Sequence, residues 1–285
     1  MKLAFSTNAF VKVPLVMAMR LIGQVGYTGV EIMADKPHYF PPSARPEDLT
    51  AIQGALRQNQ LMVSNVNANT ATGFYTDPPP ESFFEPSLAN PQAAFRRWRV
   101  NYTKACLDFA KAIGAENVSV TSGRPLPGCP PDTGRAFLAE SLRELLEHAA
   151  VLQVHLIIEY EPGLLLQDAR SLLELLSRLN SPWLGVNLDL GHSYLAGEDP
   201  TWVIPAFGET LHNLHIEDIR GRDHFHLIPG LGDMDFHKIF DALQRIQYAR
   251  FVTVELYSYP QNPEHAARAS FDFLSAFFSQ GKGRA

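Results

Sequence analysis

The chain has 285 residues, of which 46% are hydrophobic, and its 24 lysines and arginines against 30 aspartates and glutamates leave a net charge of -6. This acidic balance, with no basic run longer than Arg96-Arg97-Trp98-Arg99, argues against nucleic acid as the main partner. No apolar stretch reaches the roughly 18 residues of a membrane span, and the N-terminus lacks the apolar region of a secretory signal, so we expect a cytoplasmic protein that does not contact a membrane.

The first half of the chain alternates short apolar runs with helical patterns. The apolar runs predict strands at 2–9, 29–35, 61–69 and 117–123. Apolar residues at helical spacing predict helices at 14–26, from Arg45 to about 60, at 93–113 and from about 132 to 152. Gly26 can end the first helix, and Asp132 or Thr133 can cap the fourth. Two cysteines, Cys106 and Cys129, are too few for a disulfide framework and are expected to be reduced thiols.

The segment at about 70–91 interrupts this alternation. It carries five prolines and the aromatic residues Phe74, Tyr75, Phe83 and Phe84, without regular periodicity. A loop of this length inside a compact domain is usually a lid, a binding loop or disordered, and its aromatic residues argue against simple disorder. We interpret it as a lid over a site, with a fixed cover or a subunit contact as the alternatives.

The second half repeats the alternation. Strands are predicted at 155–162, 184–192, 211–219 and 251–257, and helices at 168–180, 200–211, 235–247 and 263–280. Eight strands that alternate with eight helices favour parallel pairing and a single domain over 1–285, a closed (β/α)8 TIM barrel of the α/β class. An open doubly wound sheet is the alternative, but no GxGxxG motif follows the first strand.

Residues of metal-ligand type stand at the ends of the last four predicted strands. They are Glu159, Asp189, His215 and Glu255. Because the carboxyl ends of barrel strands meet at one face, these residues are expected to be neighbours although about thirty residues separate each from the next. Side chains alternate along a strand, so Asn187 shares the inward phase with Asp189, and Asn213 with His215. Four such residues at consecutive strand ends predict a metal site.

Five short motifs, in this order and spacing, resemble the sugar phosphate isomerase/epimerase superfamily with the xylose isomerase-like TIM barrel. They are LIIEYEP, NLDLGH, HIED, the run from His226 to Phe236 and TVELY. The resemblance covers essentially the whole chain. It implies one divalent metal ion, Mn, Mg, Co or Zn, bound by Glu159, Asp189, His215 and Glu255.

The resemblance also implies a function. The expected activity is that of an isomerase or epimerase that moves a proton on a sugar or sugar-like ketose through an enediolate, with Glu159 and Glu255 as the acid and base. His192 is similar to a histidine that contacts substrate oxygen, and His226 to one that binds substrate or supports the site. A dehydratase acting on an inosose-type substrate could use the same residues, so this alternative stays open.

Two other functions fit less well. Endonuclease IV, in the same superfamily, needs histidines where the third and fourth strands of this chain end in Asn67, Asn69, Thr121 and Ser122. A barrel that binds a metal and a ligand without turnover is the other alternative. A carbohydrate substrate is therefore the expected partner, and a homo-oligomer is an expectation from the superfamily only.

Four residues near the expected site lie outside the assigned ligand set. His38, after the second strand, could reach substrate from the opposite rim, and Arg124, after the fourth, is the best placed cation for a substrate phosphate. Glu161 is expected to cap or orient a neighbour rather than to bind metal. His224 receives no role from the sequence.

Overall fold

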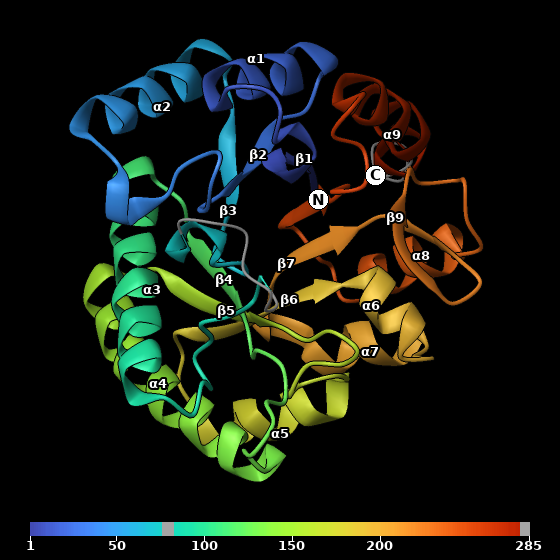
Figure 1. The fold of residues 1–285 in the computed structure, drawn as a ribbon. Coiled ribbons are helices and arrows are strands. Elements are labelled where there is room, and N and C mark those ends of the chain that lie inside the picture. The colour runs from blue at the N-terminus through green and yellow to red at the C-terminus, as the bar shows by residue number, and fades with distance from the viewer. Residues whose placement is uncertain (76–82, 280–285) are drawn as a thin grey trace.

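The computed structural model describes residues 1–75 and 83–279, and eight of its strands form a closed parallel barrel (Figure 1). The barrel strands are β1 (Lys2–Ser6), β2 (Gly29–Met33), β3 (Met62–Asn67), β4 (Asn117–Thr121), β5 (His155–Glu159), β6 (Leu184–Asp189), β7 (Leu211–Ile216) and β10 (Phe251–Val254). Each strand pairs with the next in chain order, and β10 closes the barrel on β1. The predicted TIM barrel is confirmed, and the open sheet is excluded.

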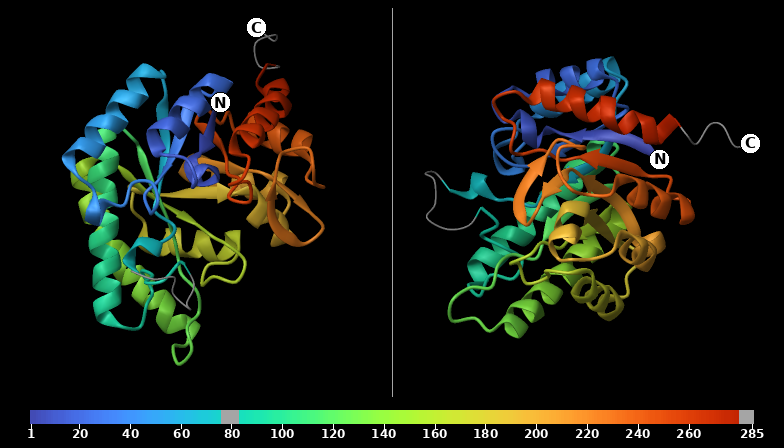
Figure 2. Two further views of the ribbon diagram at one scale, coloured as in Figure 1. Left: turned by 45° about the horizontal axis from the view of Figure 1, so that its top comes forward. Right: turned by 90° about the vertical axis from the view of Figure 1, so that its right-hand side faces the viewer.

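Helices cover the outside of the barrel (Figure 2). They are α1 (Leu15–Val25), α2 (Pro46–Gln58), α3 (Ala93–Ile113), α4 (Pro131–Leu152), α5 (Ala169–Leu179), α6 (Leu190–Leu195), α7 (Pro200–Phe207), α8 (Phe236–Arg245) and α9 (Pro263–Ser279). Among the residues described, no helix is long and apolar enough to cross a bilayer. Cys106 and Cys129 are free thiols.

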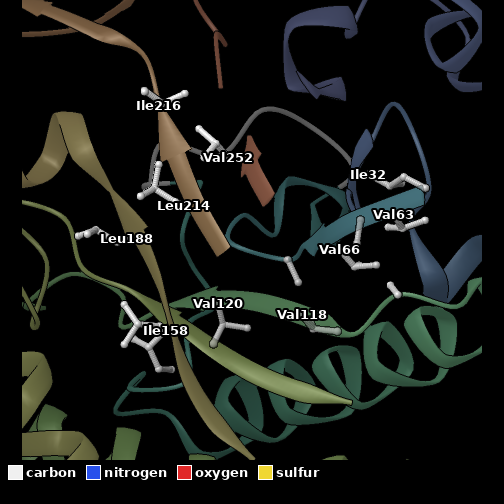
Figure 3. Close-up of a cluster of buried hydrophobic side chains, with 14 of the residues drawn as sticks. Ile32, Val63, Val66, Val118, Val120, Ile158, Leu188, Leu214, Ile216 and Val252 are labelled. Carbon is white, nitrogen blue, oxygen red and sulfur yellow. The ribbon is translucent and has the colours of Figure 1, made fainter. Parts of the chain in front are cut away.

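The side chains that point outward from the barrel strands are apolar and pack against the helices. Figure 3 labels side chains of this layer, among them Ile32, Val66, Val120, Leu188 and Ile216, and all five are fully buried. Burial of each such aliphatic side chain stabilises the fold by about 1.5–3 kcal/mol. This layer holds the helices in place. The alternate side chains of each strand point into the barrel interior.

The inward phase is polar, whereas TIM-barrel interiors are usually filled by branched aliphatic side chains. Buried residues of this phase include Ser6, Glu31, Asn65, Asn67, Ser119, Asn187, Asn213 and Thr253. They are connected by hydrogen bonds, because Thr253 Oγ1 donates to Asn213 Oδ1 at 3.1 Å and Asn213 Nδ2 donates to Asn187 Oδ1 at 2.8 Å. Asn187 Nδ2 then donates to Glu159 Oε2. A hydrogen-bonded network of this kind orients the carboxylates at the rim.

The sixth strand is shorter than predicted. It ends at Asp189 rather than at His192, and α6 begins at the next residue. The cause is a helix cap, because Asp189 Oδ1 accepts the backbone N–H of His192 at 2.7 Å. His192 is therefore carried by a helix whose position depends on Asp189.

The segment between β7 and α8, where the predicted strand ran to residue 219, contains an antiparallel hairpin. Its strands are β8 (Asp218–Arg220) and β9 (Asp223–Leu227), joined by a turn in which Gly221 has φ of 62°. The Asp218 carboxylate accepts backbone N–H groups from Gly230, Gly232 and Met234 at 2.8–3.1 Å and so holds the returning loop. Through this hairpin His224 and His226 are placed over the end of the barrel.

The lid predicted at 70–91 includes residues 76–82, which lie outside the described part of the chain, so only the two ends of the segment are described. At the start, the buried carboxylate of Asp35 accepts the backbone N–H groups of Thr72 and Gly73, both at 2.8 Å. At the end, Glu85 accepts the backbone N–H of Ser87 at 2.8 Å. The start of the segment is therefore held by the Asp35 carboxylate that follows β2, and the Glu85 carboxylate folds the end of the segment onto itself.

Candidate active site

Four predicted ligand residues converge at the carboxyl ends of β5, β6, β7 and β10. One ligand atom from each of Glu159, Asp189, His215 and Glu255 lies within 4.8 Å of every other. Their exposed fractions are 2%, 1%, 0% and 6%, so the cluster is almost closed to solvent. The parallel barrel brings these side chains together, as the strand-end pattern predicted.

His215 presents one ring nitrogen to the carboxylates and the other to a glutamate across the barrel. Its Nδ1 lies 3.4 Å from Glu159 Oε2, 3.6 Å from Glu255 Oε2 and 3.8 Å from Asp189 Oδ2. Its Nε2 lies 2.6 Å from Glu31 Oε2. A Glu31 carboxylate that accepts Nε2–H leaves the Nδ1 lone pair free for a metal ion.

Glu31 was missed by the sequence reasoning. It is completely buried and accepts hydrogen bonds from Ser6 Oγ at 2.7 Å, Asn65 Nδ2 at 2.9 Å and Asn67 Nδ2 at 3.1 Å. Burial raises the pKa of Glu31, but the adjacent His215 and these donors outweigh it and lower the pKa overall. The signal that could have identified it is a carboxylate in the inward phase of the otherwise apolar strand GVEIM.

Negative charge exceeds positive charge at the centre. Burial, followed by neighbouring carboxylates, raises the pKa of Glu159 to about 7 and that of Glu255 well above its usual value. Asp189 behaves in the opposite way, because His192, His226 and His215 outweigh the burial that would raise its pKa. Its Oδ2 is buried without a hydrogen-bond partner among the described residues. An unpaired oxygen among crowded carboxylates and one imidazole fits a divalent cation.

A second group consists of three imidazoles. His224 Nε2 lies 3.1 Å from His192 Nε2 and 3.3 Å from His226 Nε2. The Nδ1 atoms of His192 and His226 lie 3.0 Å and 2.9 Å from the carbonyl oxygens of Tyr160 and Glu255, and we assign their protons to these bonds. The three Nε2 atoms therefore converge, so this group could also hold a cation or a substrate hydroxyl. The structure thus gives His224 a position that the sequence could not.

Glu217 of the HIED motif is another buried carboxyl group beside the cluster. Its Oε1 accepts the backbone N–H of Gly191. Burial, followed by the charge of Asp189, raises its pKa well above the usual value and so favours the protonated form. A Cβ at Gly191 would lie 2.2 Å from Glu217 Oε1, which explains why this position has no side chain.

A cavity of about 460 Å³ opens above the cluster. Its lining includes Glu159, His192, His224, His226, Glu255 and Tyr257, and also Phe83 and Phe84 from the described end of the 70–91 segment. Predicted substrate residues His192, His226 and Arg124 are thus brought to one cavity. His38 is not among the lining residues, and its Nε2 lies 3.2 Å from the carbonyl oxygen of Phe10 instead.

Glu161, which was expected to cap or orient a neighbour, also lines this cavity. No hydrogen bond joins its carboxylate to another described residue, and its one ion pair among them is a contact of 4.0 Å with His224 Nδ1. Its backbone is engaged with the loop, since Glu161 N–H donates to Leu166 O at 3.1 Å. The side chain is free to face a ligand.

Comparisons with known proteins agree with this architecture. The model of the family described as xylose isomerase-like TIM barrel matches residues 19–277. Fructoselysine 3-epimerase of Escherichia coli O157:H7 is 26% identical over 98% of this chain and 99% of its own length. Inosose dehydratase of Lacticaseibacillus casei is 25% identical over 49% of this chain and 53% of its own.

Two solved structures share the fold over nearly the full length of both chains. A D-tagatose 3-epimerase-like protein superposes with a TM-score of 0.83 and 20% identity, and covers 98% of each chain. The IOLI protein, whose structure has a bound zinc atom, superposes with a TM-score of 0.81 and 18% identity over 100% of each chain. At these identities the superpositions establish the barrel.

Proposed function

Because the chain belongs to the xylose isomerase-like TIM barrel family, we propose that it is a divalent-metal-dependent epimerase or isomerase acting on a ketose or similar sugar. The observation that carries the proposal is the buried set of Glu159, Asp189, His215 and Glu255 at the floor of a cavity large enough for a monosaccharide. Epimerases among the full-length relatives support this reaction class.

In this proposal the four residues bind one divalent cation, with His215 using Nδ1. When bound, the cation supplies the positive charge that stabilises an enediolate formed next to the substrate carbonyl. Glu31 keeps the His215 ring in the orientation that presents Nδ1, and Asn67 Nδ2 links Glu31 Oε1 to Glu255 Oε1 with two contacts of 3.1 Å.

Epimerisation requires a proton to leave one face of a carbon and to return on the other. Glu159 on β5 and Glu255 beyond β10 suit this task, because β6 and β7 stand between their strands around the barrel. The two carboxyl groups therefore approach a bound sugar from different directions. One acts as base and the other as acid, and the roles reverse in the reverse reaction.

His192 and His226 are proposed to bind substrate oxygens. Burial and the neighbouring imidazoles outweigh the opposing charge of Asp189 and lower the pKa of His192 to about 3, and burial lowers that of His226 to about 4. Both rings are then neutral near pH 7 and interact with hydroxyls through Nε2. For His38 we propose no contact with substrate, because its ring is directed to the Phe10 carbonyl.

Dehydration of an inosose-type substrate is the second candidate. Removal of the same proton, followed by loss of a β-hydroxyl instead of reprotonation, needs the same base and an acid for the leaving group. The observation in its favour is the Glu217 carboxyl, which lies in one group with Asp189 and His226 and whose pKa burial raises, together with relatives named inosose dehydratase. The two reactions are distinguished by their products, an epimer of the substrate in one case and a dehydrated compound in the other.

The test is proton exchange in D2O. Metal-free protein, prepared with EDTA and reloaded separately with Mn, Mg, Co or Zn, is incubated with ketohexoses and inososes, and deuterium at the carbon next to the carbonyl is followed by NMR. We expect exchange only after reloading, with an epimer as the product. A protein that binds metal yet exchanges no proton of any of these sugars would contradict the proposal.

A further inference from the structure

Two asparagines at the end of β3 connect the residues proposed as acid and base. Asn67 Nδ2 donates to Glu255 Oε1 at 3.1 Å, and Asn67 Oδ1 accepts the backbone N–H of Asn69 at 3.1 Å. Asn69 Nδ2 then donates to Glu159 Oε2 at 2.9 Å. The two asparagines therefore join Glu255 to Glu159, and both of them line the cavity above the cluster.

Asn69 is fixed through its backbone as well as through its amide. Its carbonyl oxygen accepts from Arg99 Nη2 at 3.0 Å and from Thr121 Oγ1 at 3.4 Å. Arg99, on α3, is only 1% exposed and also donates to the carbonyl oxygens of Ala68 and Pro86. The position of Asn69 is thus set by the protein before a ligand enters, as the precise placement of a substrate requires.

The side-chain oxygen of Asn69 is left without a donor. A carboxylate only accepts hydrogen bonds, so the amide atom that faces Glu159 Oε2 is the nitrogen, and Oδ1 is the other polar atom of the same planar group. Asn69 is 6% exposed, and its Oδ1 has no hydrogen-bond partner among the described residues. A buried acceptor without a donor is costly, and a ligand in the cavity can supply the missing donor.

Other amide oxygens also lack a partner in the described part of the chain, but their positions differ. Asn65 Oδ1 and Asn117 Oδ1 are buried in this way, yet neither residue lines the cavity. Asn8 lines it, but no hydrogen bond to another described residue fixes the Asn8 amide. Asn69 combines a fixed amide, an unpaired oxygen and a place in the lining.

We propose that Asn69 is a substrate-binding residue, whose Oδ1 accepts the hydrogen of the sugar hydroxyl on the carbon beyond the reacting one while Nδ2 holds Glu159 in place. The choice of hydroxyl follows from the shared amide, because a group bound at Oδ1 lies next to the carboxyl group that moves the proton.

The proposed reaction identifies this hydroxyl. The oxygens of the carbonyl carbon and of the reacting carbon become the enediolate, whose charge the cation stabilises when bound. The hydroxyl left for Asn69 is therefore on the following carbon, which is C4 in a ketose that reacts at C3. This inference rests on the proposed function and adds a residue that determines its specificity.

The test compares a ketohexose with its 4-deoxy analogue on the metal-loaded protein. The sugar is the ketohexose that exchanges deuterium fastest, and exchange at C3 gives kcat and KM for both compounds. We expect kcat/KM to be at least about tenfold lower for the 4-deoxy sugar, because Asn69 Oδ1 is then buried beside a ligand that offers it no donor.

Two variants of Asn69 separate the two atoms of its amide. Asn69→Ala should reduce the ratio of kcat/KM between the two sugars by about tenfold, and the difference in intrinsic reactivity cancels because it is the same in both proteins. The loss that remains with the 4-deoxy sugar reports the contact with Glu159 and should fall on kcat rather than on KM. Asn69→Asp keeps an acceptor but loses the donor, so it should keep the ratio and lower kcat for both sugars.

Asn67→Ala and Asn117→Ala are the matched controls. Asn67 uses both polar atoms of its amide within the protein, so its replacement should lower exchange of both sugars by the same factor. Asn117 is 4% exposed and stands at the start of β4, at the opposite end of the barrel. Its replacement controls for a loss of stability and should change the kinetics of neither sugar.

Failure of this inference differs from failure of the proposed function. A ratio that Asn69→Ala leaves unchanged, a ratio that Asn69→Asp abolishes as fully as Asn69→Ala, or exchange confined to C1 overturns the inference and leaves the proposed activity intact. Exchange with none of the sugars overturns the proposed function. Calorimetric titration of fructose and 4-deoxyfructose into the metal-loaded proteins then decides the inference: tighter binding of fructose that is lost in Asn69→Ala supports it, and equal binding of the two sugars, or binding of neither, overturns it.

Discussion

Glu31 selects the ring nitrogen that His215 presents to the carboxylate cluster. Metal-binding histidines commonly donate their other N–H to a carboxylate, which fixes the tautomer and raises the basicity of the ligand nitrogen. Here the contact of 2.6 Å joins two side chains that are both fully buried. Burial lowers the pKa of His215, but Glu31, Glu255 and Glu159 outweigh it and raise the pKa.

We expect Glu31→Gln to weaken metal affinity by about 10- to 100-fold, because an amide carries no charge to hold the Nε2 proton. The measurement is a Mn²⁺ titration of metal-free protein, with proton exchange recorded at low and saturating metal. High metal should restore much of the exchange. Ser6→Ala removes only one donor to Glu31 and serves as the control with a smaller effect. Unchanged affinity in Glu31→Gln would show that the tautomer does not depend on this carboxylate.

At the scale of elements, the β8–β9 hairpin and the loop after it depend on one aspartate. Besides the three N–H groups from the loop, Asp218 accepts the backbone N–H of Ile219 at 2.9 Å, and its side chain is buried. The HIED motif thus combines His215 of the metal cluster with a carboxylate that shapes the loop around Pro229. The hairpin carries His224 and His226, so the position of both depends on Asp218.

Asp218→Ala is expected to lower the free energy of unfolding by on the order of 3 kcal/mol, because buried N–H donors lose their charged acceptor. Urea denaturation of the metal-free protein gives this value. The matched control is Asp233→Ala in the same loop, whose carboxylate accepts the N–H of Gly221 at an exposed site and whose loss should cost under about 1 kcal/mol. Similar losses in the two variants would contradict the role assigned to Asp218.

At the scale of the whole molecule, the amino ends of the strands form a second, different surface. A cavity of about 510 Å³ there is lined by Lys2, Arg57, His212 and Arg250, among others. The rings of His155 and His212 lie 4.0 Å apart between centroids, and Arg250 Nη1 donates to His212 Nδ1 at 2.7 Å. Burial, followed by His155 and Arg250, lowers the pKa of His212 to about 3, and burial also lowers that of His155.

These histidines predict a pH dependence of stability. In the unfolded chain a histidine titrates near pH 6.5, so below that pH the unfolded state binds protons that folded His212 does not. The unfolding free energy should therefore fall as the pH falls from about 6.5 toward 3, by up to about 1.4 kcal/mol per pH unit for this group. His212→Gln should flatten the curve in this window, measured by urea denaturation of both proteins at each pH. Parallel curves for the two proteins would refute the assignment.

Much of the fold and part of the candidate site could be predicted from the sequence. Successive side chains of a strand point to opposite faces, so Leu188 and Asp189 lie on different faces of the barrel wall. This two-residue repeat can be recognised in the local sequence alone. The eightfold repeat then brings the carboxyl ends together, so that Glu159 and Glu255 could be placed near each other without a structure. The short helix after Asp189 was not predicted, because an aspartate at the end of a strand is equally typical of a metal ligand and of a helix cap.

The sequence by itself therefore determined the barrel, its apolar outer layer and the identity of the residues that converge at its rim, because these depend on short periods and on a closed topology. Only the tertiary structure decided which partner each of them has. Glu31 and His215 are 184 residues apart and meet across the barrel, the hairpin places His224 between two other imidazoles, and His38 turns away from the cavity. Such contacts depend on the directions of individual side chains in a packed interior, which no local pattern encodes.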